Sequence, residues 1–226
     1  MENKICITLD VDWANDAILK YCIDLLEKYN LKATLFATHD SKLLKELDNS
    51  KFEIGLHPNF NNSNYDFEKP IKELKDIYPE AVGARSHSLF VSSNILQNYK
   101  KYGMKYESNN FLYLHPNLQV TKRFESFDSI PFFWSDDKII ELEREERNTY
   151  LGVKGLKVYN FHPIHIFLNT PTEKYYLENK HNYQNDKELK KNRFEGFGVG
   201  TYFENILKEI NKQKLDTYLM KDLINE

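Results

Sequence analysis

The stretch ICITLDVDWAND, residues 5–16, decides the fold class of this protein. Residues 5–9 form a short apolar run with β-branched side chains, which predicts a buried strand. The run ends at a polar cluster that contains Asp10 and Asp12. A strand that leads through a polar turn into a helical pattern is the repeating unit of α/β proteins.

Strands and helices alternate along the chain. Residues 14–29 carry apolar side chains at helical spacing, and either Asn15 or Asp12 can cap this helix. Further strands are predicted at 32–37, 52–56, 81–84, 104–107, 130–134 and 156–161, helices at 42–47, 67–77, 92–102 and 201–212, short strands and turns at 108–130, a strand or helix at 217–223, and loops at 59–64 and 169–200. This alternation predicts an α/β fold with a parallel sheet or barrel, in a single domain over residues 1–226.

Composition excludes several classes of protein. A formal charge of -3 and a pI near 6.2 argue against a nucleic-acid partner, which favours a basic surface. Cys6 and Cys22 fit buried thiols in a reducing compartment better than a disulfide framework. No apolar leader and no run of about 18 apolar residues is present, so we expect a cytoplasmic protein with no membrane span.

Polar residues follow five of the predicted strands. In parallel barrels the loops at the carboxyl ends of the strands converge on one mouth, and catalytic residues gather there. The residues at these positions are Asp10, Asp12, His39, Asp40, His57, Arg85, His87, His162 and His165. Their repeated placement predicts one shared site.

Asp10 and Asp12 can face one cavity, because side chains on an extended chain alternate with period two. In such a pair, one carboxylate can bind a cation while the other takes a proton. The alternative is a helix cap followed by an ordinary turn.

Three residues after the third and fourth strands extend this cluster. His57 can bind a divalent metal as a neutral imidazole, although a lone histidine at a strand end is more often structural. Arg85 can orient a catalytic carboxylate or bind an anionic group, or it can make a surface ion pair. His87 is a candidate metal ligand or a plain loop residue.

The last strand and an aromatic segment supply further candidates. His162 can act as a general acid, and His165 can face the site or cap the loop. The segment FWSDD, residues 133–137, can stack on a sugar and bind its hydroxyl groups, although Trp134 fits a core position equally well. We assign substrate binding to Trp134, Asp137, His165 and His39.

Six stretches together resemble the polysaccharide deacetylase, or NodB-homology, family of carbohydrate esterases, and they look closest to its WbmS-like branch. They are ITLDVDWAND (7–16), KATLFAT (32–38), EIGLHPNFN (53–61), ARSHSLF (84–90), VYNFHPIHIF (158–167) and TYLMKDL (217–223). The resemblance implies a distorted (β/α) barrel with about seven parallel strands.

The same resemblance implies roles for individual residues. Asp10 matches the catalytic base, Arg85 the residue that positions it, and His162 the general acid. Asp12 and His57 match metal ligands.

The motifs also depart from the family pattern at two places. A valine separates Asp10 from Asp12, whereas most members have the two acidic residues adjacent. Asn61 stands where the family has a second metal-binding histidine, so His87 is our candidate for the missing ligand, with His165, His39 or Asn61 itself as alternatives.

The activity implied is removal of an N-acetyl or N-formyl group from an amino sugar of a bacterial surface polysaccharide or its precursor, with a divalent metal, zinc by preference. The carbohydrate partner could be a free amino sugar, a nucleotide-sugar or a lipid-linked glycan. Two alternatives fit the motifs: a metal-independent amidohydrolase on the same barrel, and a degenerate sugar-binding module without activity. A Rossmann-type nucleotide binder is disfavoured because no GxGxxG follows the first strand.

Overall fold

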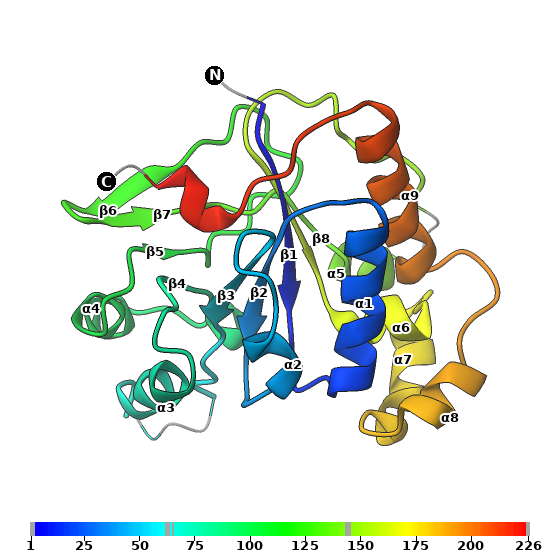
Figure 1. Ribbon diagram of the computed structural model, residues 1–226, viewed down its shortest axis with the longest axis horizontal. Helices are drawn as coiled ribbons and strands as arrows, with labels where there is room; N and C mark the ends of the chain where they lie inside the picture. The colour runs from blue at the N-terminus through cyan, green and yellow to red at the C-terminus, as the bar shows by residue number, and fades with distance from the viewer. Residues whose placement is uncertain (1–2, 62–63, 65, 143–145, 225–226) are drawn as a thin grey trace.

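Nine strands form one mostly parallel sheet across the residues that the structure describes, which are 3–61, 64, 66–142 and 146–224 of the computed structural model (Figure 1). The strands are β1 (Ile5–Asp10), β2 (Ala33–Ala37), β3 (Phe52–Leu56), β4 (Gly83–Ala84), β5 (Tyr106–Glu107), β6 (Thr121–Phe124), β7 (Phe127–Ser129), β8 (Trp134–Ser135) and β9 (Lys157–Phe161). Their order across the sheet is β6-β7-β5-β4-β3-β2-β1-β9-β8.

Helices lie around this sheet. They are α1 (Asp16–Lys28), α2 (Lys42–Lys45), α3 (Lys69–Ile77), α4 (Ser93–Lys101), α5 (Asp137–Leu142), α6 (Pro163–Leu168), α7 (Glu173–Asn179), α8 (Asp186–Lys191) and α9 (Val199–Lys212), with 3-10 turns η1 (His87–Leu89), η2 (Lys180–Asn182) and η3 (Met220–Leu223). Figure 1 shows α1 and α9 on the right of the sheet and α3 and α4 on the left. Helix α6 packs against both α1 and α9.

Strand β1 lies inside the sheet, where it pairs in parallel with β2 on one side and β9 on the other. All six of its residues are buried. Strands of a parallel sheet are covered on both faces, which explains why residues 5–9 form an apolar run without a polar face. Asp10, at the end of this strand, is therefore buried and needs polar partners.

Helix α1 confirms the helix predicted from residue spacing. The Asn15 side chain accepts hydrogen bonds from the backbone N–H groups of Ala17 and Ile18, both at 3.1 Å, so Asn15 and not Asp12 is the cap. Its buried face consists of Ile18, Leu19, Cys22, Ile23 and Leu26. Asp12 is thereby left available to the site.

The sheet is a curled half-barrel with more strands than the seven predicted. Strand β6 pairs antiparallel with β7, and β8 adds two residues beside β9. No pairing between the described residues joins β6 to β8, so the two edges stay apart. The strand predicted at 130–134 is reduced to Trp134 and Ser135 of β8.

The prediction of a loop over residues 169–200 is wrong, because the segment contains α7, η2 and α8. Thr172 caps α7 by accepting from the Tyr175 N–H, and Asn185 caps α8 by accepting from the Glu188 N–H. Most side chains here are exposed or only partly buried, so no apolar period marks the helices in the sequence. In helices this short, the capping residues Thr172 and Asn185 are a clearer sequence signal than the spacing of apolar residues.

Cys6 and Cys22 are both free and buried, as predicted. Burial raises the pKa of each thiol well above its ordinary value, which keeps both protonated. Among the described residues, no helix has the length and apolar character needed to cross a membrane.

Gly83 gives a test of the packing beneath the site. A Cβ atom at this position would lie 1.9 Å from Cζ of the buried Tyr106, which pairs with Gly83 across the sheet. We expect Gly83→Ala to destabilise the fold by about 1–3 kcal/mol, measured by urea unfolding, because the ring must move in a filled core.

Gly152→Ala is the matched control, since a Cβ there meets no atom within 4 Å. We expect it to change the unfolding free energy by less than about 1 kcal/mol. Equal stability of the two variants would contradict the packing described for β4 and β5.

Candidate active site

Four strands from the middle of the sheet, with β2 between two of them, bring the predicted chemistry to one place. Asp10 ends β1, His57 directly follows β3, Arg85 follows β4 and His162 follows β9. A cavity of about 260 Å³ opens at this edge of the sheet. Its lining consists of Asp10, Asp12, His57, Ser86, His87, Ser88, Leu89, Phe111, Phe132, Ser135, Asp137, Asn160 and His162.

Arg85 is fully buried beside the cavity and holds the carboxylate of Asp10. Its Nη1 lies 2.9 Å from Asp10 Oδ1, while Nε donates to the Ser108 carbonyl at 2.9 Å. The guanidinium also stacks over the rings of Phe36 and Phe132. Burial by itself raises the pKa of Asp10, but the charges of Arg85, His57 and His162 together outweigh it, so the pKa lies below its ordinary value. Asp10 is therefore ionised and fixed.

Asn160 holds the second oxygen of Asp10. Its Nδ2 donates to Asp10 Oδ2 at 2.8 Å, and its Oδ1 accepts from Arg85 and from Thr8 Oγ1. The sequence reasoning missed this residue, although a signal exists. Asn160 interrupts an apolar strand two residues before His162, so period two places both side chains on the same face.

Asp12, His57 and His87 form a cluster with the geometry of a cation site. Asp12 Oδ1 lies 3.2 Å from His57 Nε2 and 3.0 Å from His87 Nδ1. One ligand atom from each of the three residues lies within 4.8 Å of the others. One carboxylate with two imidazoles is a donor set that Zn²⁺ accepts, and three protein ligands leave a position open for water or substrate.

His57 gives an independent reason to expect a cation here. Its side chain is 1 % exposed, and neither ring nitrogen makes a hydrogen bond in the described part of the chain, although Nε2 lies 3.2 Å from Asp12 Oδ1 as an ion-pair contact. Its Nδ1 lies 3.9 Å from Asp10 Oδ1, beyond hydrogen-bond distance. Buried polar atoms are nearly always satisfied, so the three residues fit a bound metal ion.

Asp136 orients His162. Its Oδ1 lies 2.7 Å from His162 Nδ1, and its Oδ2 accepts from the His162 backbone N–H at 2.7 Å. Burial alone lowers the pKa of His162, but the charges of Asp136 and Asp137 outweigh it and raise the pKa well above the ordinary value. Nε2 then faces the cavity, 3.8 Å from Asp12 Oδ2. The imidazole is a charged donor beside the cation cluster.

Only some of the residues predicted to bind substrate lie at the cavity. Asp137 is exposed at the cavity and accepts a hydrogen bond from Ser135 Oγ at 2.8 Å. Trp134 is fully buried and stacks on Tyr202 with 4.6 Å between ring centroids. It therefore occupies the core position that the sequence left open as an alternative.

Three other candidates do not line the cavity: His165, His39 and Asn61. His165 is buried in α6 beside Thr170, and burial lowers its pKa to about 3. His39 contacts Thr38 Oγ1, and Asn61 is exposed. Position at a strand end does not determine the direction of a side chain once the loop has turned, so these three do not join the cluster.

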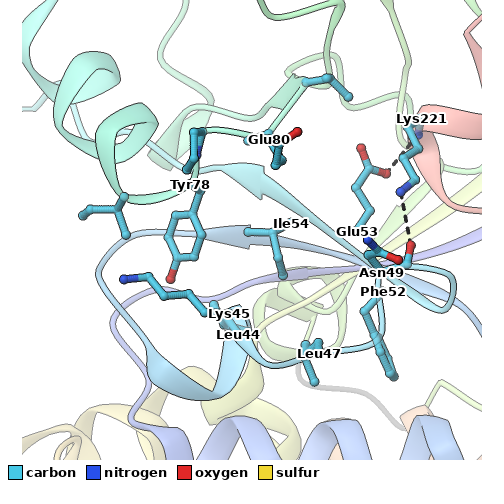
Figure 2. A pocket seen from close by; sticks show the side chains of 14 residues that line it. Leu44, Lys45, Leu47, Asn49, Phe52, Glu53, Ile54, Tyr78, Glu80 and Lys221 are labelled. Atoms are coloured by element: carbon cyan, nitrogen blue, oxygen red, sulfur yellow. Dashed lines mark hydrogen bonds between the residues drawn. The ribbon is translucent and has the colours of Figure 1, made fainter.

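A larger cavity of about 460 Å³ lies around the beginning of β3, away from this cluster (Figure 2). Its lining is mostly apolar and includes Leu44, Ile54 and Tyr78. Glu53 at its edge accepts hydrogen bonds from the Lys221 backbone N–H and the Tyr106 hydroxyl, both at 2.9 Å. Among the described residues, both groups that could hold a metal ion, Asp12 with His57 and His87 and Asp136 with Asp137 and His162, contribute to the smaller cavity instead.

Comparison with known proteins agrees with this site. Residues 7–180 match the family described as WbmS-like polysaccharide deacetylase. The crystal structure of a Bordetella bronchiseptica protein, described as a polysaccharide deacetylase involved in O-antigen biosynthesis, is 29% identical, with a TM-score of 0.86 over 92% of this chain and 90% of that chain. No curated protein matches the chain in sequence.

More distant structures share the fold alone. A CE4-family pseudoenzyme from Bacillus anthracis is 11% identical, with a TM-score of 0.58 over 100% of this chain and 66% of its own. A family 4 acetyl xylan esterase from Clostridium thermocellum, solved with a cobalt ion, is 15% identical, with a TM-score of 0.52 over 97% and 89%. The match over residues 7–180 shows that the chain belongs to the WbmS-like polysaccharide deacetylase family.

Proposed function

We propose that this protein is a metal-dependent hydrolase that removes an acetyl or formyl group from the nitrogen of an amino sugar. The substrate would be a bacterial surface polysaccharide or a nucleotide-linked or lipid-linked precursor of one. One observation carries the proposal: a fixed carboxylate, Asp10, and a charged imidazole, His162, flank a three-ligand cluster in one cavity. Family membership and the described role of the Bordetella bronchiseptica protein support the substrate class.

Asp12, His57 and His87 would hold the cation, and we favour Zn²⁺. A bound divalent ion polarises an amide carbonyl and lowers the pKa of a water to about 7. Asp12 suits the role of ligand because its pKa is low: burial raises it, but contacts with His57 and His87 outweigh that effect. Asp12 therefore stays ionised throughout the neutral range.

Asp10 would take the proton of the attacking water. Arg85 and Asn160 occupy its two oxygens from one side, so the carboxylate is held toward the cavity next to His57. A base with fixed orientation loses no freedom when the proton is transferred. The same contacts keep Asp10 out of the cluster that would bind the cation.

His162 would donate a proton to the departing nitrogen, which must leave as a neutral amine. Asp136 occupies Nδ1, so Nε2 is the nitrogen that faces the cavity. Ser135 and Asp137 offer hydrogen-bonding groups to a sugar, and Phe111 and Phe132 form an apolar part of the wall. This wall suits a small acyl group.

A non-catalytic sugar-binding module is the second candidate, because a pseudoenzyme shares the fold. The buried Arg85–Asp10 pair and the Asp136–His162 pair speak against it. Burying such a charge pair costs desolvation free energy. Buried pairs that shift pKa values are often found at catalytic sites.

Asp10→Asn tests the base. We expect turnover to fall by about 10²- to 10⁴-fold, because an amide cannot take a proton, while zinc affinity stays at the wild-type level. The measurement is acetate or formate release from N-acylated amino sugars in free, nucleotide-linked and lipid-linked form.

Asp40→Asn is the matched control, since Asp40 only pairs with Lys45 at the surface. Normal turnover by Asp10→Asn would refute its role. A wild-type protein without turnover on every acylated sugar would favour the binding module.

His87→Ala tests the third ligand. We expect zinc affinity, measured by competition with a chromophoric chelator, to fall by more than the roughly 10- to 100-fold typical of residues that only support a ligand. Chelation should abolish wild-type activity and added zinc should restore it. His115→Ala, at an exposed position, is the control; equal affinity of the two variants would exclude His87 as a ligand.

Asp136→Asn tests the general acid through its pKa. Removing this charge takes away the largest contribution that raises the pKa of His162, so this pKa should fall in an NMR titration of the metal-free protein. Activity should then persist only at lower pH, because the acid must be protonated. Asp137→Asn should produce a smaller decrease, and an unchanged pKa in Asp136→Asn would contradict the arrangement.

A further inference from the structure

The turn that carries Asp12 is held in an unfavourable conformation. Asp12 has φ 43° and Trp13 has φ 60°, so two successive residues other than glycine adopt the left-handed region. A residue with a Cβ atom is strained in this region, and such conformations persist only when the surroundings impose them. This conformation directs the Asp12 carboxylate between His57 and His87.

The sheet holds one side of the turn. The Trp13 N–H donates to Thr38 Oγ1 at 2.8 Å, and the Val11 N–H donates to the Phe36 carbonyl at 3.1 Å. These contacts satisfy backbone donors. They leave the carbonyl groups of Asp12 and Trp13 to be satisfied from the opposite side.

A distant segment reaches both carbonyl groups. The Tyr183 hydroxyl donates a hydrogen bond to the Asp12 carbonyl, and Gln184 Nε2 donates to the Trp13 carbonyl at 2.9 Å. In return, Asn15 Nδ2 donates to the Gln184 carbonyl at 3.3 Å. Both donors lie 171 residues from their acceptors, just after η2.

The segment itself is a closed excursion, residues 170–196, which we call the strap. Asn169 joins its two ends, because Nδ2 donates to the carbonyl groups of Phe194 at 2.8 Å and Gly196 at 2.9 Å. Its helices α7 and α8 lie beside α6, near the end of α1 where that helix begins (Figure 1). The strap therefore has a fixed base and places Tyr183 against the turn.

We propose that the strap holds the Asp12–Trp13 turn in its left-handed conformation, and that Tyr183 is the positioning residue for the cation ligand Asp12. The inference rests on the proposed function only in treating Asp12 as a ligand. Tyr183 and Gln184 lie beyond residues 7–180, the part that matches the family. The strap is thus a structural element whose role the motifs do not describe.

The test compares two tyrosines of the strap. Tyr183→Phe removes the donor to Asp12, whereas Tyr175→Phe removes an equivalent hydroxyl that donates to the Asn192 carbonyl within the strap. We expect zinc affinity to fall by about 10- to 100-fold in Tyr183→Phe and to stay at the wild-type level in Tyr175→Phe. Hydrogen exchange at the Trp13 amide should be several-fold faster in Tyr183→Phe and unchanged in Tyr175→Phe.

Gln184→Leu should change zinc affinity and Trp13 exchange in the same direction as Tyr183→Phe. Unchanged affinity and unchanged exchange in Tyr183→Phe would overturn the proposal, as would equal losses in Tyr183→Phe and Tyr175→Phe. A wild-type protein that binds no zinc or cobalt would refute the metal site instead, while exchange at Trp13 would still show whether Tyr183 holds the turn.

Discussion

The Asp12 carboxylate joins the separate parts of this site. Its Oδ1 contacts His87 and lies close to His57, its Oδ2 faces His162, and its backbone carbonyl receives the Tyr183 hydroxyl. These partners come from four different regions of the chain. A single left-handed turn after β1 therefore determines whether the histidines share one cation.

Asp10 and Asp12 differ in role because their partners differ. Asp10 is paired with a guanidinium and an amide, which cannot be displaced by a cation without leaving Arg85 unpaired in the core. Asp12 is surrounded by imidazoles, which bind metal as readily as it does. Both carboxylates reach the cavity, Asp10 from the end of β1 and Asp12 from the left-handed turn that follows it. Their different neighbours then separate a base from a ligand.

The sequence predicted the α/β class, most of the long strands and helices, and the residues that end adjacent strands. Strand-end position was enough to place Asp10, Asp12, His57, His87 and His162 around one cavity, although Asp12 reaches it through a left-handed turn and not by the period of an extended chain. Their roles as base, ligands and acid stay predictions. Asn160 was missed although period two places it on the face of His162, and it contacts Asp10 directly. Tyr183 was not predictable in this way, because it acts across 171 positions. His39 and His165 followed strands but turned elsewhere, because the direction of a side chain depends on the loop.

Anomalous diffraction from zinc-loaded crystals, recorded on both sides of the zinc absorption edge, is the most direct measurement of the central claim. We predict one strong peak within bonding distance of Asp12, His57 and His87. A peak coordinated by Asn61 or His165 in place of His87, or no peak between residues 12 and 57, would contradict it.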